Sequence, residues 1–167
     1  MIILGIDPGY AIVGIGVIEY KGGKHRYIHH CAITTPAGMP TTERLQIIFR
    51  EMNLLLDEYK PDAVAIEELF FNSNQKTAIN VAQARGVLLV SVTNRDIPIY
   101  EYTPLQVKQS ITGYGRADKK QIQTMVKMLL HLNAIPKPDD AADALAIAIT
   151  HTQTSGLSKA LGFNKVK

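Results

Sequence analysis

The chain has 167 residues, of which 46% are hydrophobic and 20% are charged, and its formal net charge is +3. This length and composition are typical of one soluble globular domain with a substantial core. Cys31 is the only cysteine, which excludes a disulfide framework, and the apolar run at residues 2–6 is too short for a signal peptide or a membrane span. We therefore expect a cytoplasmic protein with no membrane partner.

The first third of the sequence predicts three antiparallel strands. Residues 2–6 form an uninterrupted apolar run, residues 11–19 alternate, and residues 24–33 follow a Lys21-Gly22-Gly23 turn. Strands joined by such short connections form a β-meander.

Helices and strands alternate along the rest of the chain. Residues 41–59 place apolar side chains at spacings of three and four, which predicts an amphipathic helix that ends before Pro61. Thr103-Pro104-Leu105-Gln106 has the pattern of a helical capping box. The remaining predicted elements are a strand at 63–66, a helix at about 75–92, a strand at 97–102, a helix from Pro104 to the break at Gly113, a helix at about 118–132 and a helix at about 140–150.

These elements predict an α/β fold, a mixed five-stranded sheet with helices on its faces. The strand at 2–6 is apolar without alternation, so we expect it at the centre, with the strand at 63–66 beside it. One domain then covers residues 1–153. Residues 154–167, which carry three lysines, are expected to form a mobile basic tail.

Four acidic residues stand at the ends of these elements. Asp7 follows the first strand, Glu67 follows the strand at 63–66, and Asp140 and Asp143 open the last helix. Neighbouring strands would bring Asp7 and Glu67 to one edge of the sheet, and the small residues after Asp143 would let the helix lie close to it. Carboxylates in such places are costly unless they are paired, protonated or bound to metal. Together they suggest a site for Mg²⁺ or Mn²⁺, which prefer oxygen ligands.

Each acid also has an ordinary structural explanation. Asp7-Pro8-Gly9 is a common turn sequence, and acids in the first turn of a helix stabilise its N-terminus. Gly14 and Gly16 favour a functional role for Asp7, because a strand without side chains at these positions lets a large ligand approach the backbone. Of Glu67 and Glu68, which point to opposite faces of a strand, we choose Glu67 because it directly follows the apolar run. Four convergent carboxylates are best explained by two cations about 4 Å apart that activate water and stabilise the leaving oxyanion of a phosphodiester.

Charge is distributed in blocks along the sequence. Residues 51–68 hold six acids and one lysine, a net −5, whereas residues 101–132 hold five basic residues against two acids, a net +3. The basic residues of the second block are Lys108, Arg116, Lys119, Lys120 and Lys127. A basic segment beside a carboxylate cluster suits a polyanionic substrate, although two solvated helix faces explain the same charges.

Five segments match one family pattern in order and in spacing. They are ILGIDPG at 3–9, AIE at 65–67, QARG at 83–86, QVKQ at 106–109 and AADALAIA at 141–148. Through them the chain resembles the RuvC family of Holliday-junction resolvases over nearly its whole length, up to about His151.

The resemblance implies an RNase H-like fold and symmetric, Mg²⁺-dependent nicking of four-way DNA junctions in recombination and repair. It implies that Asp7, Glu67, Asp140 and Asp143 are catalytic and bind metal, with two Mg²⁺ ions per site that Mn²⁺ can replace. It also implies a homodimer, whose interface we expect on the helix at 75–92.

The same resemblance assigns DNA contacts and a partner. Lys108 and Lys119 match lysines that act at DNA near the active site, and Phe70 matches an aromatic residue that stacks on unpaired bases. Arg116 and Lys120 complete the expected DNA-binding set. The family implies a branch-migration motor of the RuvA and RuvB type as partner. Without the family, two alternatives stay open: the lysines as ordinary surface charges and Phe70 as a core residue.

Three other functions stay open on the sequence alone. An RNase H-like nuclease related to RuvC could act on RNA or on other branched DNA. An ATPase fragment of the sugar-kinase or actin type shares the strand–Asp–x–Gly pattern, but 167 residues leave no room for its second lobe. A non-catalytic junction-binding protein predicts that Asp7→Asn leaves Mg²⁺-dependent behaviour unchanged.

Overall fold

The computed structural model describes residues 1–69, 75–161 and 166. The predicted helices and strands occur in the predicted order. They are β1 (Ile2–Asp7), β2 (Ile12–Lys21), β3 (Lys24–Thr34), α1 (Thr41–Tyr59), β4 (Ala63–Glu67), α2 (Gln75–Thr93), β5 (Ile99–Tyr102), α3 (Pro104–Thr112), α4 (Lys119–Leu129) and α5 (Asp139–Leu161). In the part of the chain that is described, no helix is both long and apolar enough to cross a membrane.

The strands form one mixed sheet in the order β3-β2-β1-β4-β5. Strand β2 is antiparallel to both β1 and β3, and β4 runs parallel to both β1 and β5. Strand β1 is central and β4 lies beside it, as predicted. Asp7 pairs across β1–β2 with Gly14, while Ile6 pairs across β1–β4 with Ile66, so that Asp7 and Glu67 follow side by side.

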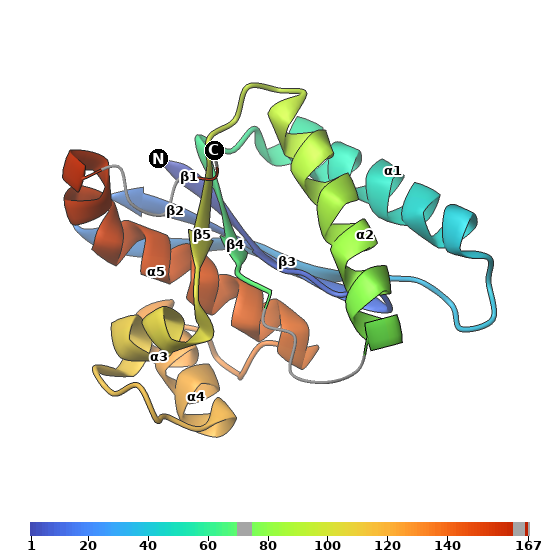
Figure 1. The fold of residues 1–167 in the computed structure, drawn as a ribbon. Coiled ribbons are helices and arrows are strands. Elements are labelled where there is room, and N and C mark those ends of the chain that lie inside the picture. The colour runs from blue at the N-terminus through green and yellow to red at the C-terminus, as the bar shows by residue number, and fades with distance from the viewer. Residues whose placement is uncertain (70–74, 162–165, 167) are drawn as a thin grey trace.

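Helices cover both faces of the sheet (Figure 1). Helices α1 and α2 pack on one face, and α5 crosses the other face with α3 and α4 packed against it. Alternation along β1 sends Ile3 into the core under α5 and Leu4 into the core under α1 and α2. Both side chains are fully buried, and burial of such a side chain stabilises the fold by about 1.5–3 kcal/mol.

Three glycines let the backbone of α5 touch the sheet. A Cβ atom on Gly5 would lie 2.0 Å from the carbonyl oxygen of Ala144, and one on Gly14 would lie 2.0 Å from that of Asp140. A Cβ atom on Gly16 would lie 2.6 Å from the backbone nitrogen of Leu145. The prediction that Gly14 and Gly16 admit a ligand was therefore wrong, because helix α5 fills that space.

Helix α5 is longer than predicted, since it continues past Thr150 to Leu161. The polar residues at its far end find partners: the Thr150 and Thr154 hydroxyls donate to carbonyls four residues earlier, at 2.9 and 2.8 Å. The Tyr102 hydroxyl lies 2.8 Å from Nδ1 of the buried His151. The helix therefore continues past the expected domain boundary at residues 153/154. The mobility of the tail stays a prediction.

Candidate active site

The ends of β1 and β4 and the start of α5 bring the predicted carboxylates together. Asp7 and Glu67 end neighbouring parallel strands. Asp7 stands opposite Gly14, and the Asp140 backbone rests on Gly14, which places the first turn of α5 over the end of β1. One helical turn further on, Asp143 lies on the face that Asp140 presents. The predicted convergence is thus a direct consequence of strand order and glycine placement.

Burial and mutual repulsion make this cluster electrostatically unfavourable. Burial, and then the charges of Glu67, Asp143 and Asp140, raise the pKa of Asp7 from 3.8 to about 7. Burial and the charge of Asp143 raise the pKa of Glu67 from 4.5 to about 7, against the opposing effect of Lys108. Burial also raises the pKa of Asp143. Carboxyl groups with raised pKa values destabilise the fold, and such groups are typically found at functional sites.

Lys119 is the counter-ion closest to the cluster. Its ammonium lies 3.1 Å from Oδ2 of Asp143 and 3.7 Å from Oδ2 of Asp139. Partial burial acts to lower the pKa of Lys119, but its hydrogen bond to Asp143 and the nearby negative charges outweigh burial and raise it. Asp139, which no pattern in the sequence singles out, also accepts a hydrogen bond from Lys137 at 2.7 Å and so pairs with two lysines at the edge of the site.

Two capping boxes place the lysines. The Thr103 hydroxyl and the Gln106 side chain cap α3 reciprocally, as predicted, and Asp118 and Gln121 do the same for α4. Lys119 is therefore the first residue of α4, held by a fixed helix start. Lys108, Lys119, Glu67 and Asp143 line one cavity of about 210 Å³, whose apolar wall includes Val107 and Ile122.

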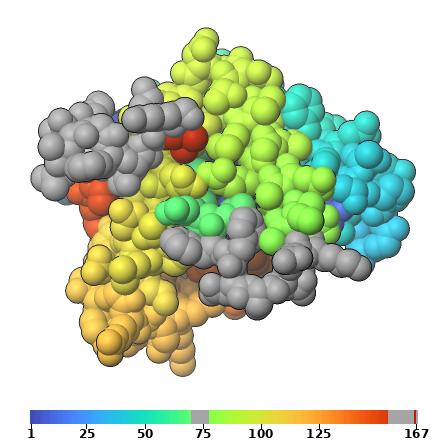
Figure 2. Space-filling model, in the orientation of Figure 1, coloured from blue at the N-terminus to red at the C-terminus, as the bar shows by residue number. Residues whose placement is uncertain are grey.

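Two of the remaining predicted residues lie outside this cavity. Arg116 and Lys120 are exposed, one in the α3–α4 connection and the other in the first turn of α4, and neither lines the cavity. In the space-filling view, the green end of β4 reaches the surface between α2 and the yellow α3 (Figure 2). Phe70 lies outside the described residues.

The chemistry of the side chains suits a hard divalent cation. The available donors are carboxylate oxygens, which Mg²⁺ and Mn²⁺ prefer, and a cation would remove the repulsion that raises the pKa of Asp7 and Glu67. As they stand, the described side chains include no group of three or more acidic, histidine or cysteine residues that could hold a metal ion.

The strand order, with β4 parallel to β1, gives the chain an RNase H-like fold. The family model described as crossover junction endodeoxyribonuclease RuvC matches residues 3–151. The chain belongs to this family.

Known relatives agree over nearly the whole chain. The crossover junction endodeoxyribonuclease RuvC of Alkaliphilus oremlandii is 58% identical over 159 residues, which cover 95% of this chain and 97% of the relative. The solved structure of Thermus thermophilus RuvC in complex with a Holliday junction substrate is 36% identical, with a TM-score of 0.92 and coverage of 99% of each chain. The yeast mitochondrial Holliday junction resolvase shares the fold alone, at 13% identity and a TM-score of 0.67 over 95% of this chain and 82% of that one.

Proposed function

We propose that this protein is a structure-selective endonuclease that resolves four-way DNA junctions by hydrolysing one phosphodiester in each of two opposed strands. The observation that carries the proposal is the convergence of Asp7, Glu67 and Asp143 in one partly buried acidic site of a RuvC-family chain. Recombination and repair are the processes that generate and need to remove such junctions.

We assign metal binding to Asp7, Glu67, Asp140 and Asp143, with two Mg²⁺ ions per site, which Mn²⁺ can replace. When bound, the ions supply a Lewis acid and an activated water at the scissile phosphate. The raised pKa of Asp7 and Glu67 supports this assignment, because repulsion among buried carboxylates is relieved by cations.

The basic residues of α3 and α4 act on the DNA. Lys108 and Lys119 share a cavity with Glu67 and Asp143, so a phosphate held by cations at these carboxylates would lie within their reach. There they orient the phosphodiester and offset the charge that develops on it. Arg116 and Lys120, which are exposed nearby, neutralise flanking phosphates. Phe70 is proposed to stack on unpaired bases, as the family implies.

We propose that the protein works as a homodimer through α1 and α2. The outer faces of these helices form an apolar groove of about 570 Å³ that includes Leu45, Phe49 and Val87. Phe49 is 45% exposed and Val90, also in the groove, is 53% exposed. Apolar surface of this kind is typical of a protein interface. A two-fold dimer presents one site to each of two opposed strands of an approximately two-fold junction. The remaining proposed partner is a cytoplasmic branch-migration motor of the RuvA and RuvB type.

A cleavage assay tests the proposed function. With Mg²⁺, wild-type protein should nick a four-way junction far faster than a linear duplex or a structured RNA of matched sequence. Asp7→Asn should lose cleavage and retain most junction binding, whereas Glu43→Gln, which changes an exposed acid on α1, should leave both unchanged. Equal cleavage of junction, duplex and RNA would defeat the resolvase proposal in favour of a broader RNase H-like nuclease. Unchanged cleavage by Asp7→Asn would defeat the assigned site.

A further inference from the structure

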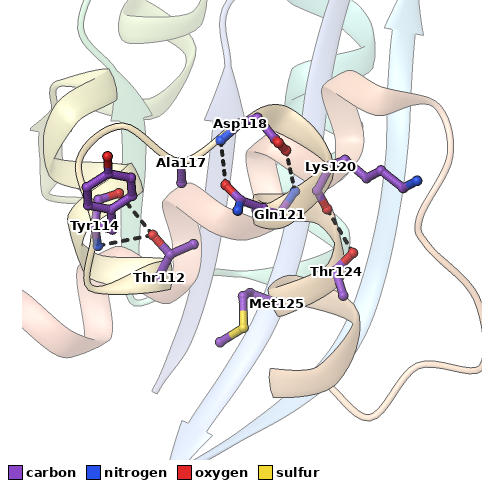
Figure 3. A pocket seen from close by; sticks show the side chains of 8 residues that line it. All are labelled: Thr112, Tyr114, Ala117, Asp118, Lys120, Gln121, Thr124 and Met125. Atoms are coloured by element: carbon purple, nitrogen blue, oxygen red, sulfur yellow. Dashed lines mark hydrogen bonds between the residues drawn. The ribbon is translucent and has the colours of Figure 1, made fainter.

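A second cavity is lined by the α3–α4 pair and by the loop that joins these helices. Its volume is about 480 Å³, and it opens between the end of α3, the connecting loop and the first turns of α4. Figure 3 shows Tyr114 and Thr112 on one side and Met125 on the other, with the Lys120 side chain directed away from Tyr114. Cavities of this size are typical of sites that take small molecules.

Most polar groups around the cavity are already used inside the protein. The Thr112 hydroxyl donates to the carbonyl of Lys108 at 2.9 Å, and the Thr124 hydroxyl donates to that of Lys120 at 2.8 Å. Asp118 and Gln121 bond each other's backbone in the α4 capping box, at 2.8 and 2.9 Å. The cavity therefore presents mainly apolar surface, and its lining includes the ring of Tyr114, which is 56% exposed. An exposed ring beside an apolar cavity favours a flat aromatic ligand.

The cavity and the acidic site share the same two helices. On α4, Lys119 and Ile122 line the acidic cavity, whereas Lys120 and Met125 line the second one. On α3, Lys108 belongs to the acidic cavity and Thr112, one turn later, to the second. Lys119 and Lys120 are consecutive residues that line different cavities, so the two cavities adjoin at the first turn of α4. A strand held at the acidic site therefore passes close to the second cavity.

We propose that this cavity is a subsite for a nucleobase of the substrate DNA close to the scissile phosphate. The base stacks on Tyr114, and the exposed ammonium of Lys120 holds an adjacent phosphate. Stacking accepts any base, so the subsite requires a base without selecting one. The inference rests on the proposed function, because it takes junction DNA as the ligand.

Binding measurements with modified junctions test the subsite. In an Asp7→Asn background, which prevents cleavage, Tyr114→Ala should weaken junction binding about fivefold to 100-fold, and Tyr114→Phe should bind within about threefold of its parent. Met128→Ala is the matched control, since Met128 is 61% exposed on α4 and does not line the cavity. Circular dichroism verifies that each variant is folded.

Removing the base should have the same effect as removing the ring. A set of junctions, each with one abasic position near the nick, should contain one that weakens binding by the parent as much as Tyr114→Ala does. On that junction Tyr114→Ala should cost nothing further. Equal binding by Tyr114→Ala and its parent on the intact junction, or fully additive losses at every position, would overturn the subsite. Failure of the wild-type protein to prefer and cleave junctions would overturn the proposed function itself, whatever Tyr114 does.

Discussion

Replacing Asp7 by asparagine should stabilise the metal-free protein at neutral and alkaline pH. Burial, and then the charges of Glu67 and Asp143, raise the pKa of Asp7 from 3.8 to about 7. The pKa of Asp7 thus differs by about three units between the unfolded and the folded state. At ~1.36 kcal/mol per unit, this difference lowers the free energy of unfolding by at most about 4 kcal/mol. The repulsion between Asp7 and Glu67 is one interaction, so it lowers the free energy of unfolding once and not once for each residue.

The direction of the effect follows from where the proton is held. The unfolded chain releases the Asp7 proton near pH 3.8, whereas the folded protein holds it to about pH 7. Below about pH 3.8 Asp7 is protonated in both states and does not destabilise the fold. As the pH rises from about 3.8 to about 7, the free energy of unfolding falls. Asparagine has no proton to lose. Wild type and Asp7→Asn should therefore be similar near pH 4 and differ by about 2–4 kcal/mol near pH 8.

Urea unfolding measures this difference. Far-ultraviolet circular dichroism in a chelating buffer at about pH 4, 6 and 8 gives the free energy of unfolding of wild type, Asp7→Asn and the control Glu43→Gln. Saturating Mg²⁺ at pH 8 should close the gap, because cation binding stabilises only a folded state that has its full ligand set. A gap that does not grow with pH in chelator, or an Asp7→Asn variant less stable than wild type at pH 8, would refute the electrostatic reasoning.

Three further perturbations test other parts of the molecule. Lys119→Gln should lower the single-turnover cleavage rate about 10²- to 10³-fold with a smaller change in junction affinity; a purely structural lysine would alter both little. Gly14→Ala should lower the free energy of unfolding by about 1–3 kcal/mol and abolish cleavage, because its Cβ atom would lie 2.0 Å from the Asp140 carbonyl; urea unfolding of a variant as stable as wild type contradicts this packing. Phe49→Asp should shift the protein from dimer to monomer in sedimentation velocity and uncouple the two nicks, and an unchanged dimer would place the interface elsewhere.

The central position of β1, the place of β4 beside it and the meeting of Asp7 and Glu67 at one edge could be predicted, because local patterns constrained all three. The apolar run of β1 has no alternation, which required burial on both faces and therefore a central position. With β4 beside it, Asp7 and Glu67 had to end at one edge. The Thr103–Gln106 capping box likewise gave the start of α3 from four residues of sequence. Each of these features depends on interactions within one helix or strand, or between two neighbouring strands.

Features that depend on packing between distant elements were missed. In the sequence, Gly14 is one glycine within a predicted strand. Only the path of α5 shows that the absence of a side chain there leaves space for the Asp140 backbone. The continuation of α5 past Thr150 depends on partners on other elements, such as the Tyr102 hydroxyl beside His151. Asp139 stands next to Asp140 with no distinguishing pattern, and its pairing with Lys137 and Lys119 follows from the fold alone.

The position of Lys119 links folding of the acidic site to its proposed chemistry. Its pairing with Asp143 at 3.1 Å offsets part of the repulsion in the site, whereas Asp7 has no lysine as an ion-pair partner among the described residues. Yet Asp143 can hold a cation and Lys119 can meet a phosphate only if this pair separates. The Lys119 side chain is 54% exposed, and exposed ion pairs contribute about 0–1 kcal/mol, so separation costs little. If the proposed function holds, a cation bound at Asp143 would take over this charge compensation and leave the Lys119 ammonium free for a phosphate. Lys119 would then serve as an exchangeable counter-ion of the acidic site.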